Sequence, residues 1–220
     1  MQPSDSPVGA GPTARVHGEA IAAAKTLLRK AVLLRRDLRP LAVRKADDAR
    51  RFDRLQQRLE ADRPQAVAAY LSSGSEPGTL QLVAWLAAQG IPVLLPVLTG
   101  PDGRALGQPA WATYGGPDAL RVGLMSILEP TTEVVPGSPL ADVDLVICPA
   151  LAANTAGDRL GRGGGWYDRA LLEAGPQARL WALLNDDEVL EAIPTQPWDV
   201  LVGAIATPTR LVRCSNATAG

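Results

Sequence analysis

Apolar residues recur at helical spacing in the first third of the chain. This spacing predicts a helix from Glu19 to about Leu38, which Pro40 ends. The apolar side chains expected on its inward stripe are Ile21, Leu28, Ala31, Leu34 and Leu38. A second helix is expected over about 43–61, with a dense polar face outward. Its expected inward residues are Phe52, Leu55 and Leu59.

From Gln65 onward the pattern changes to short, continuous apolar runs. The five runs are 66–71, 92–98, 143–150, 179–185 and 200–207. Between the first two, a helix is expected from a cap at Thr79 to about Gln89, with Gly90 at its end. Continuous apolar runs separated by helical segments are typical of strands buried on both faces. The pattern therefore predicts an α/β fold with a mostly parallel sheet flanked by helices.

Length and composition favour one domain with a core of small and aliphatic side chains. The chain has 220 residues, of which 46% are hydrophobic and only 4% aromatic. No internal repeat is visible. We expect the domain to span 19–213, after a disordered Pro/Gly/Ser-rich leader over 1–18 and before a tail over 214–220.

Charge and targeting signals restrict the class of partner. The net charge is −1, although Lys25 to Glu60 holds 12 basic and 5 acidic residues, which we interpret as solvated helix faces. We therefore expect no nucleic-acid or membrane partner. The start of the chain lacks a signal-peptide pattern, and the longest apolar region is interrupted by prolines, so the expected compartment is the cytoplasm.

Few residues are available for thiol or imidazole chemistry. Cys148 and Cys214 form neither a disulfide framework nor a CxxC pair, and His17 is the single histidine. A zinc site built on His and Cys is not expected, and neither is a Ser-His-Asp triad.

The stretch GDRLGRGGGWYDR, 157–169, is the strongest sign of a binding site. It connects the third apolar run to a helix expected to start near Gly165 or Trp166, and ligands bind at that edge of open α/β sheets. Glycines let the backbone approach a ligand, helix starts attract phosphate, and Arg159 and Arg162 add permanent charge. The stretch matches neither the dinucleotide fingerprint nor the P-loop, so a plain turn stays open as an alternative.

Residues 159–169 closely resemble the signature R-L-G-x-G-x-G-Y-Y-D-R of the 5-formyltetrahydrofolate cyclo-ligase family. Other features of that family occur in the right order over about Lys25 to Arg213. They are the K-x-x-x-R of the first helix, YLSSGSEPGT at 70–79, PVLLPV at 92–97, GLMSILEP at 123–130 and IPTQPWD at 193–199. The resemblance implies a NagB/RpiA/CoA transferase-like fold.

The resemblance also implies a reaction. Such an enzyme uses ATP and Mg²⁺ to phosphorylate the formyl oxygen of 5-formyltetrahydrofolate, and the ring then closes to 5,10-methenyltetrahydrofolate with release of ADP and phosphate. The implied partner is a reduced folate, and the implied assembly is a monomer or a weak homodimer.

Each role carried over from the family falls on a matching position of this chain. The implied ATP contacts are Lys25, Thr26, Leu27, Leu28, Arg29 and Arg159. The implied folate contacts are Leu71, Glu76, Arg162, Gly163, Gly164, Gly165 and Trp166. Arg162 and Trp166 are the implied catalytic residues, and Asp168 and Asp199 the implied Mg²⁺ ligands. Taken alone, Lys25 and Arg29 are better interpreted as a solvated pair on a helix surface, Glu76 as an exposed turn residue, and Asp168 or Asp199 as a helix or turn carboxylate.

The chain departs from the family pattern at several places. Trp166 stands where Tyr is usual, Trp198 where His is frequent, and Glu188 near a position that is commonly Gln. Ala153 and Asn154 replace a usual Phe-Asp. The changes at 153–154, 188 and 198 support a second hypothesis, a non-catalytic folate- or nucleotide-binding relative. A third hypothesis, a nucleic-acid binder that uses the basic helices, is weakened by the balanced charge and the scarcity of aromatic residues there.

Overall fold

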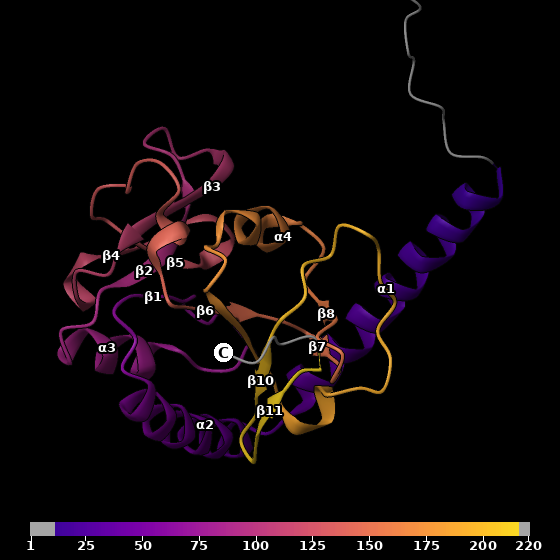
Figure 1. Ribbon diagram of the computed structural model, residues 1–220, viewed down its shortest axis with the longest axis horizontal. Coiled ribbons are helices and arrows are strands. Elements are labelled where there is room, and N and C mark those ends of the chain that lie inside the picture. Colours follow the sequence, from indigo (N-terminus) through magenta and orange to yellow (C-terminus); the bar gives the residue numbers. More distant parts are fainter. Residues whose placement is uncertain (1–11, 216–220) are drawn as a thin grey trace, which may run out of the picture.

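The computed structural model describes residues 12–215 (Figure 1). Its helices are α1 (Pro12–Leu38), α2 (Leu41–Asp62), α3 (Leu80–Ala88) and α4 (Trp166–Ala170). Its strands are β1 (Val67–Ala68), β2 (Val93–Thr99), β3 (Ala105–Thr113), β4 (Leu120–Val122), β5 (Leu128–Pro130), β6 (Leu145–Pro149), β7 (Ala152–Ala153), β8 (Arg159–Leu160), β9 (Arg179–Leu183), β10 (Ala204–Ala206) and β11 (Leu211–Arg213).

Seven strands form the central sheet in the order β11-β10-β9-β6-β1-β2-β3. The five inner strands are parallel, and each is one of the five apolar runs predicted from the sequence. The two edge strands, β3 and β11, are antiparallel to their neighbours. The predicted α/β architecture with a mostly parallel sheet is therefore confirmed, while the antiparallel edges were not anticipated.

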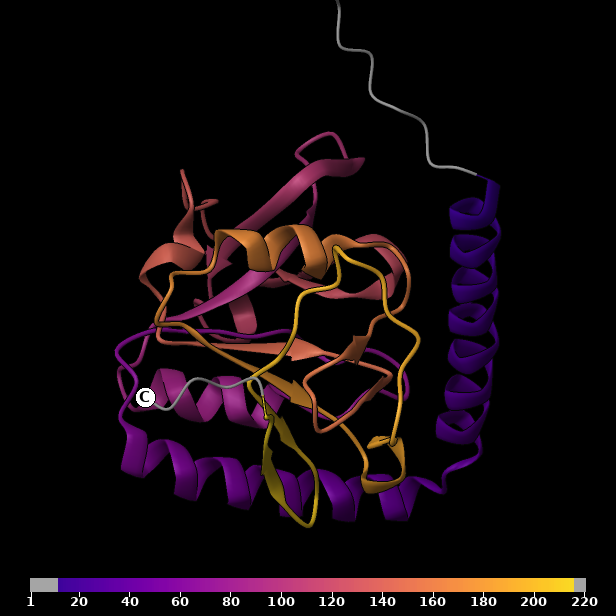
Figure 2. The same cartoon turned by 45° about the vertical axis from the view of Figure 1, so that its right-hand side comes forward.

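Alternate side chains of the inner strands point into two separate cores, as the pleat of a strand requires. On one face, Val67, Leu145 and Ile147 pack against the inward residues of α2 and α3. On the other face, Val146 and Cys148 pack against the region around α4. Figure 2 shows the resulting layers, with α2 and α3 on one side of the sheet and α4 on the other. The predicted inward positions Leu55 and Leu59 are buried, and Phe52 is partly buried.

The first helix lies against the domain on a different face from the one predicted. Leu34 and Leu38 are 61% and 72% exposed, and Ala31 is also exposed. Lys25, Val32 and Arg36 are buried instead. The prediction was wrong for Ala31, Leu34 and Leu38, whereas Ile21 is partly buried and Leu28 packs against the apolar cluster around Val32. It missed that buried ion pairs of Lys25 and Arg36 also hold this helix.

The ends of the chain also differ from expectation. Helix α1 begins at Pro12, so residues 12–18, expected in a disordered leader, are helical; residues 1–11 lie outside the described part. Cys214, expected in the tail, is buried and its amide donates to Gly203 O. Among residues 12–215, no helix is both long and apolar enough to cross a membrane.

Candidate functional site

The glycine- and arginine-rich stretch 157–169 contains the loop that connects β8 to α4 at the carboxyl edge of the parallel strands. It leaves β8, which pairs with β7 just beyond the end of β6, and enters α4 at Trp166 as predicted. Gly163 has φ +102° and Gly165 has φ +63°, conformations that glycine adopts without strain. A Cβ at Gly163 would also stand 3.2 Å from Cζ of Arg29. Glycine at 163 therefore lets α1 approach the loop closely.

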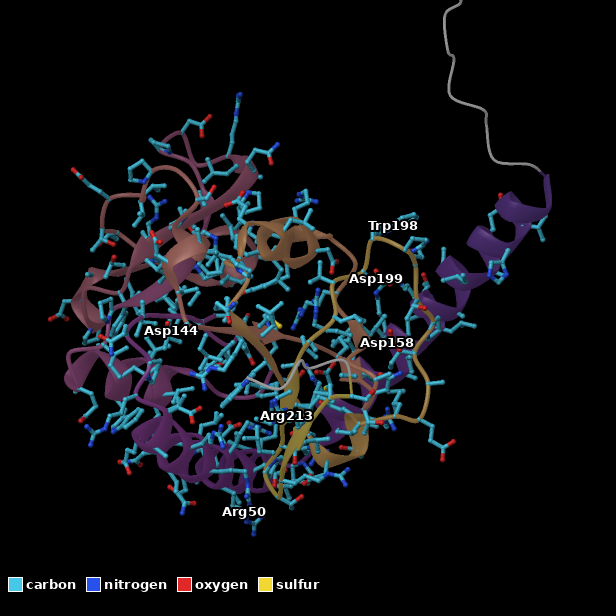
Figure 3. All side chains as sticks on the ribbon, in the orientation of Figure 1. Arg50, Asp144, Asp158, Trp198, Asp199 and Arg213 are labelled. Atoms are coloured by element: carbon cyan, nitrogen blue, oxygen red, sulfur yellow. The ribbon has the colours of Figure 1, made fainter. Side chains whose placement is uncertain are left out.

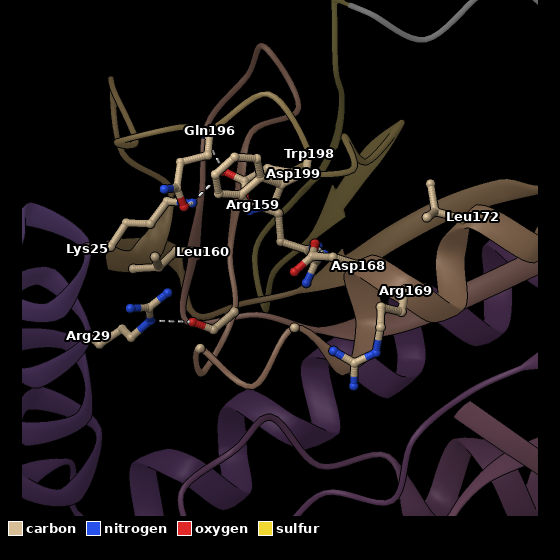
Figure 4. Close-up of a pocket in the computed structure, with 13 residues that line it drawn as sticks. Lys25, Arg29, Arg159, Leu160, Asp168, Arg169, Leu172, Gln196, Trp198 and Asp199 are labelled. Atoms are coloured by element: carbon tan, nitrogen blue, oxygen red, sulfur yellow. Dashed lines mark hydrogen bonds and ion pairs between the residues drawn. The ribbon is translucent and has the colours of Figure 1, made fainter. Parts of the chain in front are cut away.

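A pocket of about 310 Å³ opens between α1, this loop and the segment before β10 (Figure 4). Lys25 and Arg29 enter it from α1, and Arg159 enters from β8. Four basic and two acidic side chains line it, so its charge favours an anion. Figure 3 shows Trp198 and Asp199 on the loop that passes beside α1, where both contribute to the wall.

Inside this pocket, cations and carboxylates are paired with one another. Lys25 Nζ lies 2.5 Å from Asp199 Oδ2, and it also donates to Gln196 Oε1 at 3.3 Å. Arg159 Nη2 donates to Asp168 Oδ1. Arg29 Nε donates to Gly161 O at 2.9 Å, which fixes its guanidinium against the loop (Figure 4). These contacts bring together six side chains from four distant segments of the chain.

A second pocket of about 370 Å³ lies on the other side of the loop. Its walls include every residue that the family resemblance assigned to folate: Leu71, Glu76, Arg162, Gly163, Gly164, Gly165 and Trp166. Arg162 Nε lies 3.0 Å from Glu76 Oε1, and Glu76 also accepts a hydrogen bond from the Ser73 amide at 2.8 Å. The lining is otherwise mostly apolar, as is usual for small-molecule sites.

Trp166 belongs to an aromatic cluster at the edge of this pocket. Its ring centroid is 5.2 Å from that of Trp111 and 4.8 Å from that of Tyr167. The Tyr167 hydroxyl is buried without a hydrogen-bond partner among the described residues, and burial raises its pKa well above the ordinary value. The cluster supports Trp166 from behind, so that its indole forms part of the pocket wall.

The two pockets share a wall made of loop residues. Arg159, Gly161, Gly163, Gly165 and Asp168 line both. Arg159 is only 5% exposed, and its buried Nε has no hydrogen-bond partner among the described residues. A buried donor without an acceptor is costly, so this atom fits a ligand that supplies one.

The sequence matches the 5-formyltetrahydrofolate cyclo-ligase family over residues 21–208. The chain belongs to this family. A 5-formyltetrahydrofolate cyclo-ligase of Mycolicibacterium smegmatis is 39% identical over 145 residues, which cover 66% of this chain and 74% of that protein. The Escherichia coli K12 protein of the same name is 32% identical over 146 residues, which cover 66% of this chain and 79% of that protein.

Solved structures agree with this assignment to a ligase family. The structure of Aquifex aeolicus 5,10-methenyltetrahydrofolate synthetase superposes with a TM-score of 0.74 at 25% identity, over 89% of this chain and 95% of that one. A Mycoplasma pneumoniae 5,10-methenyltetrahydrofolate synthetase has a TM-score of 0.65 at 19% identity, over 84% of this chain and 98% of that one, and supports the fold.

Three of the residues expected from the cyclo-ligase family at the nucleotide lie away from the pockets. Thr26 and Leu27 are exposed, and Leu28 packs on the small apolar cluster around Val32. Thr26 Oγ1 donates to Ala22 O within the helix. Only the first and last residues of the K-x-x-x-R motif reach the site, because positions four apart share a helix face.

Other residues of the site were not anticipated. Arg169 and Gln196 line the smaller pocket, and Met125 lines the larger one. Arg169 and Gln196 lie within quoted motifs, so their neighbours offered a signal. Met125, which itself has φ +53°, also lies within a quoted feature, GLMSILEP at 123–130.

Most residues that depart from the cyclo-ligase pattern lie outside the two pockets. Ala153 and Asn154 line neither pocket. Asn154 Oδ1 accepts the amides of Ala156 and Asp158, both at 3.0 Å, and so closes the turn before β8. Glu188 is buried in an ion pair with Arg36. Trp198 differs, because it is 65% exposed and lines the smaller pocket.

Proposed function

We propose that this chain catalyses the ATP-dependent cyclisation of 5-formyltetrahydrofolate to 5,10-methenyltetrahydrofolate, with release of ADP and phosphate. The observation that carries the proposal is the shared wall at 159–168, which lies between a cationic pocket and a larger, mostly apolar one. A phosphoryl group in the first pocket can meet an acceptor oxygen in the second only across that wall.

The chemistry needs both pockets at once. The formyl oxygen attacks the terminal phosphorus of ATP, and the bond from phosphorus to the bridging oxygen of ADP breaks. N10 of the folate then bonds to the formyl carbon, phosphate leaves with the former formyl oxygen, and the N10 proton is released. An amide-like oxygen is a poor leaving group until it is phosphorylated, which explains why ATP is consumed.

Lys25, Arg29 and Arg159 are proposed to hold the triphosphate. Arginine offers planar, permanently charged donors that match phosphate oxygens, and lysine adds a compact charge. Since Arg159 borders both pockets, we place it beside the phosphoryl group in transfer, where its unpaired Nε gains an acceptor. Phosphoryl transfer depends mainly on such positioning and charge stabilisation.

Binding of the nucleotide would exchange the partners of the two ion pairs. Without a ligand, Lys25 is neutralised by Asp199 and Arg159 by Asp168. Phosphate oxygens replace the carboxylates as partners of the two cations, and the released carboxylates then need a cation of their own. The pairs therefore keep four charged groups in position and avoid an uncompensated buried charge in the free protein.

Asp168 and Asp199 are proposed to hold Mg²⁺ together with phosphate oxygens. Among residues 12–215, no group of three or more His, Cys, Asp or Glu side chains could hold a metal alone. Two carboxylates fit a magnesium ion that arrives with nucleotide, since Mg²⁺ is usually bound by one or two carboxylates plus substrate phosphates. The ion would neutralise charge that develops on the transferring phosphoryl group.

The larger pocket is proposed to bind the reduced folate. Glu76 accepts hydrogen bonds readily and would face the N–H edge of the pterin, while Trp166 offers an aromatic wall and Leu71 an apolar one. Arg162 is half-exposed and paired with Glu76, so it can turn toward the phosphoryl group when the pterin takes its place at Glu76. Trp166 lacks the hydroxyl of the usual Tyr and is expected to act by packing and exclusion of water.

The decisive experiment follows the absorbance of methenyl-folate with purified protein, 5-formyltetrahydrofolate, ATP and Mg²⁺. We expect product only with ATP present, in equal amount to the ADP formed. Arg159→Ala should weaken ATP binding roughly ten- to a hundredfold, the range for loss of a charge-assisted hydrogen bond. Arg104→Ala, in an exposed turn, is the matched control.

The turnover assay also tests the alternatives when thermal stability and nucleotide affinity are measured beside it. An increase in thermal stability with ATP and folate, without turnover at any enzyme level, would indicate a non-catalytic relative. Nucleotide affinity that is unchanged in Arg159→Ala would contradict the role of this residue. A cytoplasmic location and the lack of a nucleic-acid partner stay predictions of the sequence.

A further inference from the structure

Helix α1 presents an apolar stripe to solvent on the side opposite its buried charges. The stripe consists of Val16, Ala20, Ala23, Leu27, Ala31, Leu34 and Leu38, all of them exposed. The large members Val16, Leu27, Leu34 and Leu38 are 66%, 69%, 61% and 72% exposed. Contiguous exposed apolar surface of this kind usually marks an interaction site.

Specific polar contacts fix the orientation of α1. Its inward face is fixed by Lys25 with Asp199, by Arg29 with Gly161 O and by Arg36 with Glu188. Rotating the helix to bury the leucines would break all three contacts. In Figure 2, α1 stands at the edge of the domain, and no helix or strand within residues 12–215 covers its outward side. The stripe is therefore available to a partner.

The spacing of the stripe is the same in both directions. Counted from either end, the steps between its seven members are four, three, four, four, three and four residues. The pattern is therefore palindromic about Leu27. In an antiparallel pair of such helices, Leu27 meets Leu27, Ala20 meets Leu34, Ala23 meets Ala31, and Val16 meets Leu38. Large side chains then meet at the axis and at the two ends, while the small residues Ala20, Ala23 and Ala31 between them let the two helices approach each other.

We propose that this face of α1 pairs, antiparallel, with the same face of a second copy of the chain. A contact through identical surfaces is what a twofold dimer requires, and a palindromic stripe supplies it. Neighbouring sequence offers no other cover, since residues 1–11 contain only Met1 and Val8 as large apolar side chains. The charged residues beside the stripe are two acidic and two basic (Glu19, Asp37, Lys30 and Arg35), which does not favour an anionic membrane.

The area buried between the two helices sets the expected affinity of the dimer. Twenty-two helical steps span about 33 Å, and a helix contact about 10 Å wide gives roughly 330 Å² for each copy. The total of about 700 Å² is below the roughly 1,200 Å² of a stable interface. Leu41 and Val43, 59% and 42% exposed at the start of α2, could extend it. We expect a reversible dimer with a dissociation constant weaker than about 1 µM.

Sedimentation velocity over a wide range of protein concentration tests the proposal. The wild type should shift from monomer to dimer as concentration rises. Leu34→Glu should remain monomeric, and the double variant Ala20→Lys/Leu34→Glu should recover the dimer, because residues 20 and 34 face each other across the axis. Val122→Glu, at an exposed position on β4, is the control and should dimerise as the wild type does. Circular dichroism checks that each variant is folded.

Cross-linking tests the symmetry independently. Cys148 and Cys214 are buried, so Leu27→Cys introduces an exposed thiol at the proposed axis. Mild oxidation should give a covalent dimer far faster than Ala22→Cys, which is exposed on another side of α1. The proposal is overturned if the wild type is monomeric at every concentration, or if Leu34→Glu still dimerises. It is also overturned if Ala20→Lys does not restore dimerisation to Leu34→Glu. Binding of the wild type to anionic phospholipid vesicles that is lost in Leu34→Glu would overturn it in favour of a membrane partner.

Discussion

Replacement of Arg36 by Met should destabilise the protein more than any single change at its surface. The Arg36 and Glu188 side chains are 1% and 2% exposed, and two parallel bonds of 2.7 Å join them. Arg36 Nη2 also donates to Ala150 O at 2.7 Å. Glu188 accepts from the amide and the side chain of Asn185, at 2.8 and 2.9 Å. The pair therefore joins α1 to the ends of β6 and β9.

Loss of one partner leaves a buried carboxylate with no counter-charge. Such a change costs about 3–5 kcal/mol, against a typical total stability of about 5–15 kcal/mol. Met keeps the volume of the aliphatic stem, so most of this cost is electrostatic. The expected loss is thus about a fifth or more of the free energy of unfolding.

Urea denaturation measures this loss. The midpoint of Arg36→Met should fall with an unchanged slope, and addition of Glu188→Gln should restore about 1–3 kcal/mol, because the unpaired charge is gone. The exposed pair Arg104–Asp102 is the control, and Arg104→Met should change stability by less than about 1 kcal/mol. A loss below about 1 kcal/mol in Arg36→Met, or no recovery in the double variant, would refute the reasoning.

Three further changes test the site and its surroundings. Asp168→Asn should raise the Mg²⁺ concentration needed for half-maximal turnover, and an unchanged titration would place the metal elsewhere. Gly163→Ala should cost about 1–2 kcal/mol in urea denaturation because of its positive φ, while Gly164→Ala, with open space around it, should cost less. Burial raises the pKa of the Cys214 thiol from 9.0 to about 11. Since the unfolded thiol ionises first, the free energy of unfolding should fall as pH rises from 9 to 11, and Cys214→Ala should lessen that fall.

The sequence was most informative where one physical requirement dominated. Each inner strand is buried on both faces, so its run of apolar residues had no other interpretation, as 143–150 illustrates. Strand β3 was missed because its exposed, partly buried and buried residues follow no regular alternation, and it contains Pro109. Edge strands carry a weak pattern because one side of their backbone need not be covered.

The position of the loop beside a pocket could be predicted from the sequence, but the face of α1 could not. Arg159 and Asp168 border both pockets, while their roles at the phosphate and the metal stay predictions. Periodicity placed Leu34 and Leu38 inside, whereas the buried positions belong to Lys25 and Arg36. Their partners, Asp199 and Glu188, are 174 and 152 residues away, so no local pattern could indicate that these charges are compensated.

The contact between Lys25 and Asp199 has a consequence for the order of events during synthesis. A ribosome must deliver nearly the whole polypeptide before the anion pocket can close, because one wall comes from the first helix and the opposite wall from residue 199. Nascent chains that stop short of this point lack one wall of the proposed nucleotide site, however well their sheet has formed. Capture of ATP would thus report that the last segment has joined the first, a late and long-range step in folding.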